Sequence, residues 1–181
     1  VAVTLTVLGT VSMVLGSLLA LLQWDVKRMF AYSSISQIGY VMLAFGMGML
    51  LMIRGDAGPA AMLAMAGGLY HLLNHAVFKG LLFLNAGALE HLLDTRDLKS
   101  MGGLNRAMPV TSSTSLMASL SISGLPPFNG FFSKLIIIAA AIYGGYYLLA
   151  VLAVVVSIVT LAYFMKFQRF AFYNKASLPR K

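Results

Sequence analysis

The sequence predicts an all-α polytopic membrane protein with five membrane-spanning helices, the fourth of them broken. Of its 181 residues, 60% are hydrophobic and only 10% are charged, whereas soluble domains carry about 25% charged residues. Mean hydropathy is +0.87, and residues 1–22 contain no charge. Too little polar surface remains to cover a compact globule, which excludes a soluble enzyme, a disordered chain and a nucleic-acid-binding domain. The absence of cysteine excludes disulfides, iron–sulfur clusters and thiolate metal sites.

The first three spans follow from apolar runs of sufficient length. About 20 residues cross the ~30 Å hydrocarbon core as a helix. Residues 1–22 meet this length and end at a charged turn, and residues 30–53 form a second span that ends near Arg54. Residues 60–89 form a third span, although they include two histidines and a lysine. The polar connection 91–108 then precedes the next apolar run.

The fourth span, residues 109–143, is interrupted at GLPPFNG, residues 124–130. Two adjacent prolines remove two backbone donors, and the flanking glycines do not oppose unwinding. The segment is therefore either two spans with a short loop or one span whose helix breaks inside the membrane. Residues 146–166 form the last span, and a basic tail, 167–181, follows it. We treat residues 1–181 as a single membrane domain.

The positions of the basic residues decide between these two interpretations. The chain has 13 lysines and arginines, of which Lys79 and Lys134 lie inside apolar segments. If residues 109–143 cross once, Arg54 stands alone on one side, and the other side holds Lys27, Arg28, Arg96, Lys99, Arg106, Lys166, Arg169, Lys175, Arg180 and Lys181. If they cross twice, the tail changes sides and the division becomes six against five. Cytoplasmic loops carry the excess of basic residues, so we predict five spans with the basic loops and the C-terminal tail in the cytoplasm.

Three ionisable side chains in the third span suggest a path for protons. His71, His75 and Lys79 lie within roughly 80° of one helix face and rise about 12 Å along it. Histidine changes its charge near neutral pH, and a desolvated lysine can also do so. The alternatives are interhelical hydrogen bonds for the histidines and snorkelling for the lysine. Three such groups on one stripe are costly to keep in lipid without a use. The two histidines lack a third ligand, so we predict no metal site.

The broken helix adds a second deep cation. Backbone groups freed at Gly124, Pro126, Pro127 and Gly130 must face protein or a hydrated cavity, because lipid offers no hydrogen bonds. Broken helices form ion sites in transporters, and Lys134 follows the break directly. We therefore place Lys134 on the predicted proton path. The alternative is a proline kink that only packs against its neighbours.

Three further ionisable residues lie at the predicted cytoplasmic boundary. Lys27 precedes the second span, and Glu90 and His91 follow the third. Glu90 and His91 are candidates for the entrance or exit of the path, and capping of the helix end is their alternative. Lys27 either supports the path or fixes the topology.

Four ordered motifs resemble those of the antiporter-like membrane subunits. They are DVKRMFAYSSISQIGY at residues 25–40, HLLNHAVFKGLLFL at 71–84, TRDL at 95–98 followed by GGL at 102–104, and GLPPFNGFFSK at 124–134. This family comprises the proton-translocating subunits of respiratory complex I, the Mrp-type sodium/proton antiporters, and the membrane arms of formate hydrogenlyases and energy-converting NiFe hydrogenases. Its members contain two inverted five-helix repeats, each with a broken helix. The resemblance implies that this chain is the second repeat and that the first repeat lies elsewhere, in the same subunit or in a split partner.

The resemblance also implies roles for individual residues. Lys79 would be the central proton-holding lysine, with His71 and His75 beside it. Lys134 would be the broken-helix lysine on the exit path, and Lys27 the basic residue that opens the signature helix. Lysine and histidine favour protons as the coupled ion, since no carboxylate cage for sodium is visible.

The predicted function is proton or cation translocation by a buried Lys/His relay, as a subunit of a complex I-related or hydrogenase-type redox complex. An Mrp-type sodium/proton antiporter subunit without redox chemistry is the alternative, and a structural membrane subunit is the third. We expect no catalysis and no cofactor in this chain itself, because the chemistry would lie in partner subunits. Expected partners are other membrane subunits and redox subunits, with no nucleic acid. We expect a bacterial or archaeal cytoplasmic membrane, with the mitochondrial inner membrane as the alternative.

Overall fold

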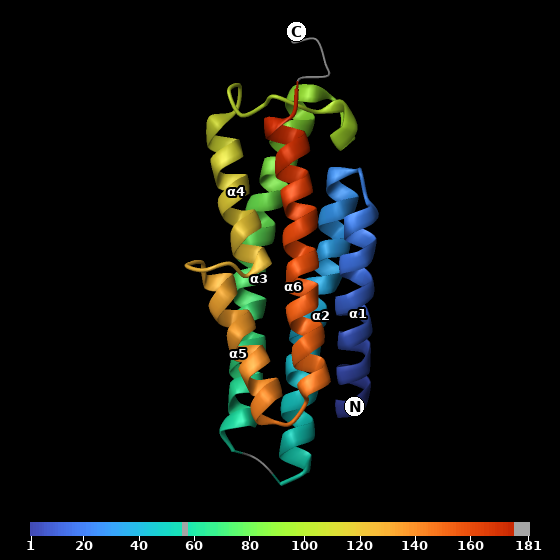
Figure 1. Cartoon of the computed structure of the whole chain (residues 1–181), viewed down its shortest axis with the longest axis vertical. Helices are drawn as coiled ribbons and strands as arrows, with labels where there is room; N and C mark the ends of the chain where they lie inside the picture. Colours follow the sequence, from blue (N-terminus) through green and yellow to red (C-terminus); the bar gives the residue numbers. More distant parts are fainter. Residues whose placement is uncertain (56–57, 176–181) are drawn as a thin grey trace.

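The computed structural model describes residues 1–55 and 58–175, and most of them are helical (Figure 1). This confirms the predicted all-α fold. Its helices are α1 (Ala2–Leu22), α2 (Val26–Ile53), α3 (Pro59–Leu93), α4 (Pro109–Ser123), α5 (Asn129–Tyr143) and α6 (Tyr147–Gln168), with a 3₁₀ helix at Leu98–Ser100 and a π-helical turn at Arg169–Tyr173. By length and hydropathy, α1, α2, α3 and the combined α6 and π-helical turn can each cross a membrane.

Local sequence signals make α2 and α3 longer than the predicted spans 30–53 and 60–89. Helix α2 begins at Val26 because the Asp25 carboxylate accepts a hydrogen bond from the backbone N–H of Arg28 at 2.8 Å, which is the usual N-cap contact. Helix α3 begins at Pro59, whose fixed φ suits a first helical turn. It ends at Asp94, which adopts the left-handed conformation of a helix C-cap.

The fourth crossing is one broken span, as predicted. Helices α4 and α5 contain 15 residues each and follow one another along the bundle, so neither repeats the crossing of the other (Figure 1). Gly124 ends α4 with φ +81°, a conformation that only glycine adopts readily. Gly130 lies against α4 so closely that an added Cβ would overlap the backbone oxygen of Ser121. These two glycines therefore allow the break to be compact.

The last helix extends beyond the predicted end at Lys166. Helix α6 continues to Gln168, and the π-helical turn carries the chain to Tyr173. The reason is packing, because Phe167, Ala171 and Phe172 are buried in the largest core cluster. The start of the predicted tail at residue 167 is thus wrong. Arg180 and Lys181 lie outside the described residues.

In the residues that the structure describes, three segments that carry basic residues lie together at one end of the bundle. Backbone hydrogen bonds join the turn before α2 to the α3–α4 connection, from the N–H of Val26 to the oxygen of Arg96 at 3.0 Å and from the N–H of Leu98 to the oxygen of Trp24 at 2.9 Å. The N–H of Asn105 donates to the oxygen of Phe172 at 3.2 Å. The Lys166 ammonium, near the end of α6, donates to the backbone oxygen of Gln23 at 2.6 Å. The end of α6 therefore lies beside both other segments, and we call this the basic end. Helix α2 ends at the opposite end of the bundle (Figure 1), and Arg54 directly follows it.

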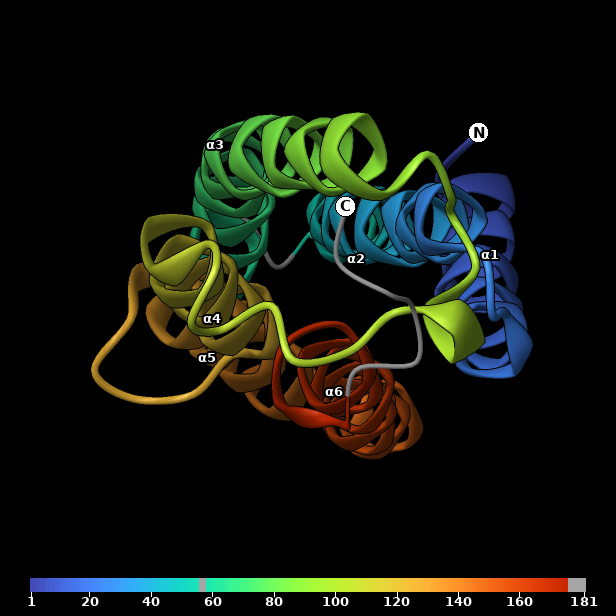
Figure 2. The same ribbon diagram turned by 90° about the horizontal axis from the view of Figure 1, so that it is seen from above.

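Seen along the bundle axis, α1, α2 and α3 form one row, and α6 and the broken helix α4–α5 form a second (Figure 2). Helix α2 packs between α1 and α3, and α3 contacts both halves of the broken helix. Side chains from α2, α3, α5 and α6 therefore meet in the interior. Several of the buried side chains in this region are polar.

Candidate functional site

Lys79 is buried in the middle of the bundle, with 7% of its surface exposed. Its ammonium nitrogen donates to the backbone oxygen of Phe30 at 2.6 Å and to the hydroxyl of Ser33. The rings of Phe30 and Phe83 flank it, with centroids 5.6 Å and 5.8 Å from the nitrogen. Both salt bridges found within the described residues involve Glu90, not Lys79. Lys79 is therefore held by neutral oxygens of α2, an environment that can accept its charged or its neutral form.

Both ring nitrogens of His71 have side-chain partners from other helices. Nδ1 lies 2.9 Å from the hydroxyl of Ser133 on α5, and Nε2 lies 3.2 Å from Oε1 of Gln37 on α2. All three side chains are fully buried. His71 thus connects α2 to the start of α5 through one imidazole, whose two nitrogens can hold a proton alternately.

His75 is less well connected than its place in the sequence suggests. It lies one turn from both His71 and Lys79 and is buried, but its Nδ1 has no hydrogen-bond partner within residues 1–55 and 58–175. The structure therefore places the predicted His71–His75–Lys79 column on one helix without completing it by hydrogen bonds. In the same described residues, no three His, Asp or Glu side chains are grouped closely enough to hold a metal ion.

Lys134 lies in the interior too, on the opposite row of helices. It is 3% exposed, and its nitrogen lies 4.8 Å from the centroid of the Tyr40 ring. That ring also faces the imidazole of His71, with centroids 5.5 Å apart. The Tyr40 hydroxyl lies 2.9 Å from the hydroxyl of Ser157 on α6. Tyr40 therefore contacts both Lys134 and His71. The Lys134 ammonium completes no hydrogen bond with the described part of the chain.

A pair of asparagines holds the break of the fourth span against α3. The side-chain nitrogen of Asn129 donates to the side-chain oxygen of Asn74 at 2.9 Å, and the Asn74 nitrogen donates to the Asn129 backbone oxygen at 3.3 Å. Asn74 precedes His75, and Asn129 begins α5. The contact therefore fixes the start of α5, and with it Ser133 and Lys134, relative to the histidines of α3.

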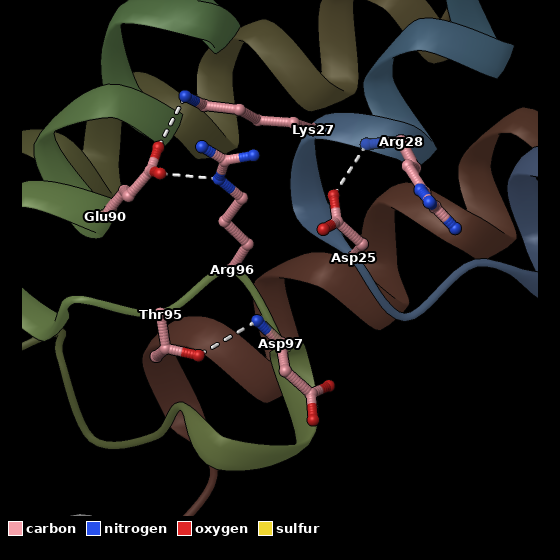
Figure 3. Close-up of polar contacts among 7 residues, drawn as sticks. All are labelled: Asp25, Lys27, Arg28, Glu90, Thr95, Arg96 and Asp97. Carbon is pink, nitrogen blue, oxygen red and sulfur yellow. Dashed lines mark hydrogen bonds and ion pairs between the residues drawn. The ribbon is translucent and has the colours of Figure 1, made fainter.

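The boundary residues form an ion cluster at the basic end (Figure 3). The Glu90 carboxylate, at the end of α3, pairs with Lys27 of α2 and Arg96 of the α3–α4 connection, with N–O distances of 2.5 Å each. Lys27 is thus brought to Glu90 and not to the partners of Lys79. The other boundary candidate, His91, is exposed next to Glu90.

The site contains residues that were not assigned to it from the sequence. Ser33, Gln37 and Tyr40 are spaced i, i+4 and i+7 on α2, so they share one helix face. This spacing of polar groups in an apolar helix was the signal that could have revealed them. Tyr163 of α6 is also buried in this region. No sequence pattern distinguishes it from the other tyrosines.

Comparison with a known family matches most of the chain. The family described as NADH:quinone oxidoreductase/Mrp antiporter, TM, matches residues 1–160. The Na(+)/H(+) antiporter subunit A1 of Staphylococcus haemolyticus strain JCSC1435 is 35% identical over 192 residues, covering 98% of this chain. The subunit A1 of Staphylococcus aureus strain JH9 is 34% identical, with the same coverage. The chain spans 24% of the length of these two relatives.

Two solved structures share the arrangement of helices. One is the Mrp complex from Dietzia sp. DQ12-45-1b, with a TM-score of 0.85 and 31% identity over 96% of this chain and 30% of that chain. The other is the membrane-bound sulfane sulfur reductase, an archaeal respiratory membrane complex, with a TM-score of 0.84 and 33% identity over 96% of this chain and 27% of that chain. The arrangement of helices is therefore shared by an antiporter complex and a respiratory complex.

Proposed function

Because the chain belongs to the NADH:quinone oxidoreductase/Mrp antiporter transmembrane family, we propose that it forms part of an antiporter-like subunit that carries protons or another cation across the membrane. It is an integral membrane protein with several crossings. We further propose that the transported ion is a proton and that Lys79, His71 and Lys134 carry it, with His75 beside them.

The observation that carries this proposal is the buried connection of Lys79 and His71 to facing groups on other helices. Lys79 reaches the Phe30 carbonyl and Ser33, and His71 reaches Gln37 and Ser133. Burying a cation without a carboxylate partner is costly. If the side chain at position 79 only packed against its neighbours, an apolar residue there would stabilise the fold more than lysine does. A proton-holding group explains the lysine, since it must be charged in one state and neutral in the other.

In this mechanism the protein supplies positions for a proton at defined atoms. Protonated Lys79 donates to the Phe30 carbonyl and the Ser33 oxygen, and neutral Lys79 can accept from the Ser33 hydroxyl. His71 takes a proton at one ring nitrogen and releases one from the other, between Gln37 and Ser133. Lys134, near the Tyr40 ring, receives the proton on the side of the break. The ion cluster of Glu90, Lys27 and Arg96 forms the mouth at the basic end.

The orientation and partners are also proposals. The basic end carries Lys27, Arg96 and other basic residues, which supports a cytoplasmic position for it. The chain spans about a quarter of the subunit A1 relatives, which supports a further repeat beside it and a place among other membrane subunits. We propose a bacterial or archaeal cytoplasmic membrane as its location.

A transport assay tests the proposal directly. The assembled complex containing the full subunit is reconstituted in vesicles, and proton movement is followed with a pH-sensitive dye. We expect K79A to abolish transport while the complex remains intact. Normal proton transport by intact K79A complex would contradict the relay and would favour a structural role for the chain.

Two settings for this subunit remain candidates, each supported by one of the similar structures. The similarity to the archaeal respiratory complex supports a subunit driven by redox chemistry. The similarity to the Mrp complex and to the Na(+)/H(+) antiporter subunits supports an antiporter without redox chemistry. Purification of the native complex separates them, because only the first setting predicts iron–sulfur or NiFe subunits in stoichiometric amounts. Sodium-dependent proton movement in their absence would support the second.

A further inference from the structure

Lys134 is a buried cation to which the described residues offer no hydrogen-bond partner. Only 3% of its surface is exposed, and its ammonium nitrogen completes no hydrogen bond within residues 1–55 and 58–175. Neither of the ion pairs found among these residues involves it. Lys79, by contrast, donates to two oxygens of α2. A buried charge without such partners is costly, so the protonated form of Lys134 needs another source of stabilisation.

The aromatic ring of Tyr40 supplies an electrostatic contact to Lys134. The ammonium nitrogen lies over this ring, 4.8 Å from its centroid. This is within the distance of about 6 Å at which a ring face attracts a cation. The attraction arises because the faces of an aromatic ring carry partial negative charge, and it is stronger where water is excluded. A neutral amine has no comparable attraction. The ring therefore favours the protonated form of Lys134.

The position of the Tyr40 ring is fixed by contacts with other helices. Its hydroxyl donates to the backbone oxygen of Ala153 at 2.5 Å and lies 2.9 Å from the hydroxyl of Ser157, both on α6. The ring is fully buried in an apolar cluster with residues from α1, α5 and α6. It also faces the imidazole of His71, with centroids 5.5 Å apart. An ammonium held over this ring thus stays near the histidine.

We infer that the ring of Tyr40 holds the Lys134 ammonium near His71 and stabilises its protonated form, so that Lys134 can take up the relayed proton. The inference rests on the proposed function, because it concerns one group of the same relay. Tyr40 is a positioning residue in this scheme and does not itself carry the transported proton. Its hydroxyl keeps the ring in place, and the ring acts on the cation.

The other groups around Lys134 do not stabilise its charge in this way. His71 and His75 are the titratable side chains of α3 that interact electrostatically with it, and a positive charge on either would repel the ammonium. A cavity of about 330 Å³ beside Lys134, between the broken helix and α6, is lined by uncharged neighbours that include the hydroxyls of Ser123 and Ser157. Neither hydroxyl is hydrogen-bonded to the ammonium.

The test compares substitutions of Tyr40 that keep or remove the ring. The assembled complex containing the full subunit is placed in vesicles, and proton transport is measured as a function of pH. In Tyr40→Leu, Lys134 would become neutral at a lower pH. We therefore expect the midpoint of the alkaline decline in transport to move to lower pH by about one unit, the size of a desolvated cation–π contact. Tyr40→Phe keeps the ring and should keep the parent midpoint.

Fluorinated phenylalanines at position 40 separate the electrostatics of the ring from its shape. Fluorine withdraws electron density from the ring face, which weakens the attraction for a cation, and it changes the size of the ring little. We expect the midpoint to move to lower pH with each added fluorine. Phe172→Leu is the matched control, because it removes a buried ring that packs against Phe167 at 5.8 Å at the basic end. It should keep the parent midpoint even if the yield of complex falls.

The outcomes separate this inference from the proposed function. If K79A abolishes transport but Y40L keeps the parent midpoint, the role of the ring is wrong and the relay stands. If K79A transports normally, the relay itself is wrong. Equal shifts in Y40F and Y40L would assign the effect to the hydroxyl, and an equal shift in F172L would assign it to packing. Either result would overturn the inference. Should Y40L fail to assemble, the fluorinated series decides, and a midpoint that does not depend on fluorination would contradict the role of the ring.

Discussion

The ammonium nitrogen of Lys79 lies 2.6 Å from the backbone oxygen of Phe30 in the neighbouring helix α2. The same oxygen also accepts from the hydroxyls of Ser33 at 2.9 Å and Ser34 at 3.1 Å. The backbone carbonyl of Phe30 thus holds the side chain of Lys79, which lies 49 residues later in the sequence. Lys79 is thus held by neutral oxygens, and neither ion pair found in the described residues involves it.

Replacing Lys79 by arginine should stop transport although the positive charge is kept. Arginine does not deprotonate in proteins, so K79R would hold the charge permanently. We expect K79R and K79M to reduce proton transport by about a hundredfold or more, the range for loss of a proton-transfer group. The measurement is dye-detected proton movement in vesicles. Lys99→Arg, at an exposed position of the 3₁₀ helix, is the control. Substantial transport by K79R would mean that charge alone suffices at this position.

Gly130→Ala should prevent the two halves of the fourth span from packing. An added methyl would overlap the backbone oxygen of Ser121, which cannot move away as a side chain could. Overpacking of this kind costs about 1–3 kcal/mol, so we expect a lower melting temperature and a lower yield of assembled complex.

Gly87→Ala is the matched control for this substitution. Gly87 lies in α3 with open space where an added Cβ would stand, and alanine is the better helix former by about 1 kcal/mol. We expect G87A to assemble as well as the parent. A G130A complex as stable as G87A would show that the break tolerates a wider separation of α4 and α5.

Glu90→Gln should make transport sensitive to salt. The Glu90 carboxylate pairs with both Lys27 and Arg96. If these residues form the proposed mouth, loss of the carboxylate leaves two unbalanced cations there that repel an approaching proton. We expect slower transport at low ionic strength and recovery at high salt, because the Debye length falls from about 10 Å at 0.1 M to about 3 Å at 1 M.

The control for Glu90 is Asp94→Asn. Asp94 is an acid at the end of α3 with a φ of 53°, a conformation that asparagine also tolerates. The variant removes the same charge without breaking the ion cluster. Equal salt dependence of E90Q and D94N would assign the effect to net charge at this end and not to the Glu90 pairs.

Lys166→Met should weaken the fold without changing the pH profile of transport. The Lys166 ammonium donates to the backbone oxygens of Leu21 at 2.5 Å and Gln23 at 2.6 Å, which are carbonyls at the end of α1. Methionine fills similar space but cannot donate, so about 1–3 kcal/mol of stability should be lost. The checks are the melting temperature of the complex and the pH dependence of transport per assembled complex. A changed pH profile would indicate that Lys166 belongs to the proton path.

Much of the fold could be predicted because membrane insertion leaves strong marks in a sequence. Apolar length limits where helices can cross, and the uneven distribution of basic residues selected one broken fourth span over two complete ones. Helix ends were less predictable. The second span begins at Val26 and not at Phe30 because Asp25 caps it, and the last one continues because Phe167 and Phe172 are buried. Capping and tertiary burial are not visible in hydropathy.

The amino-acid order alone requires that His71, His75 and Lys79 share one face of α3 and that Lys134 follows the break. Helical periodicity requires the first, and proline and glycine chemistry the second. The partners of these groups depend on tertiary packing. Helix α2 brings Phe30, Ser33 and Gln37 to the face of α3, and α5 brings Ser133. Hydrogen bonds between helices depend on how each helix is rotated and on its depth in the bundle, and packing of whole helix faces sets both.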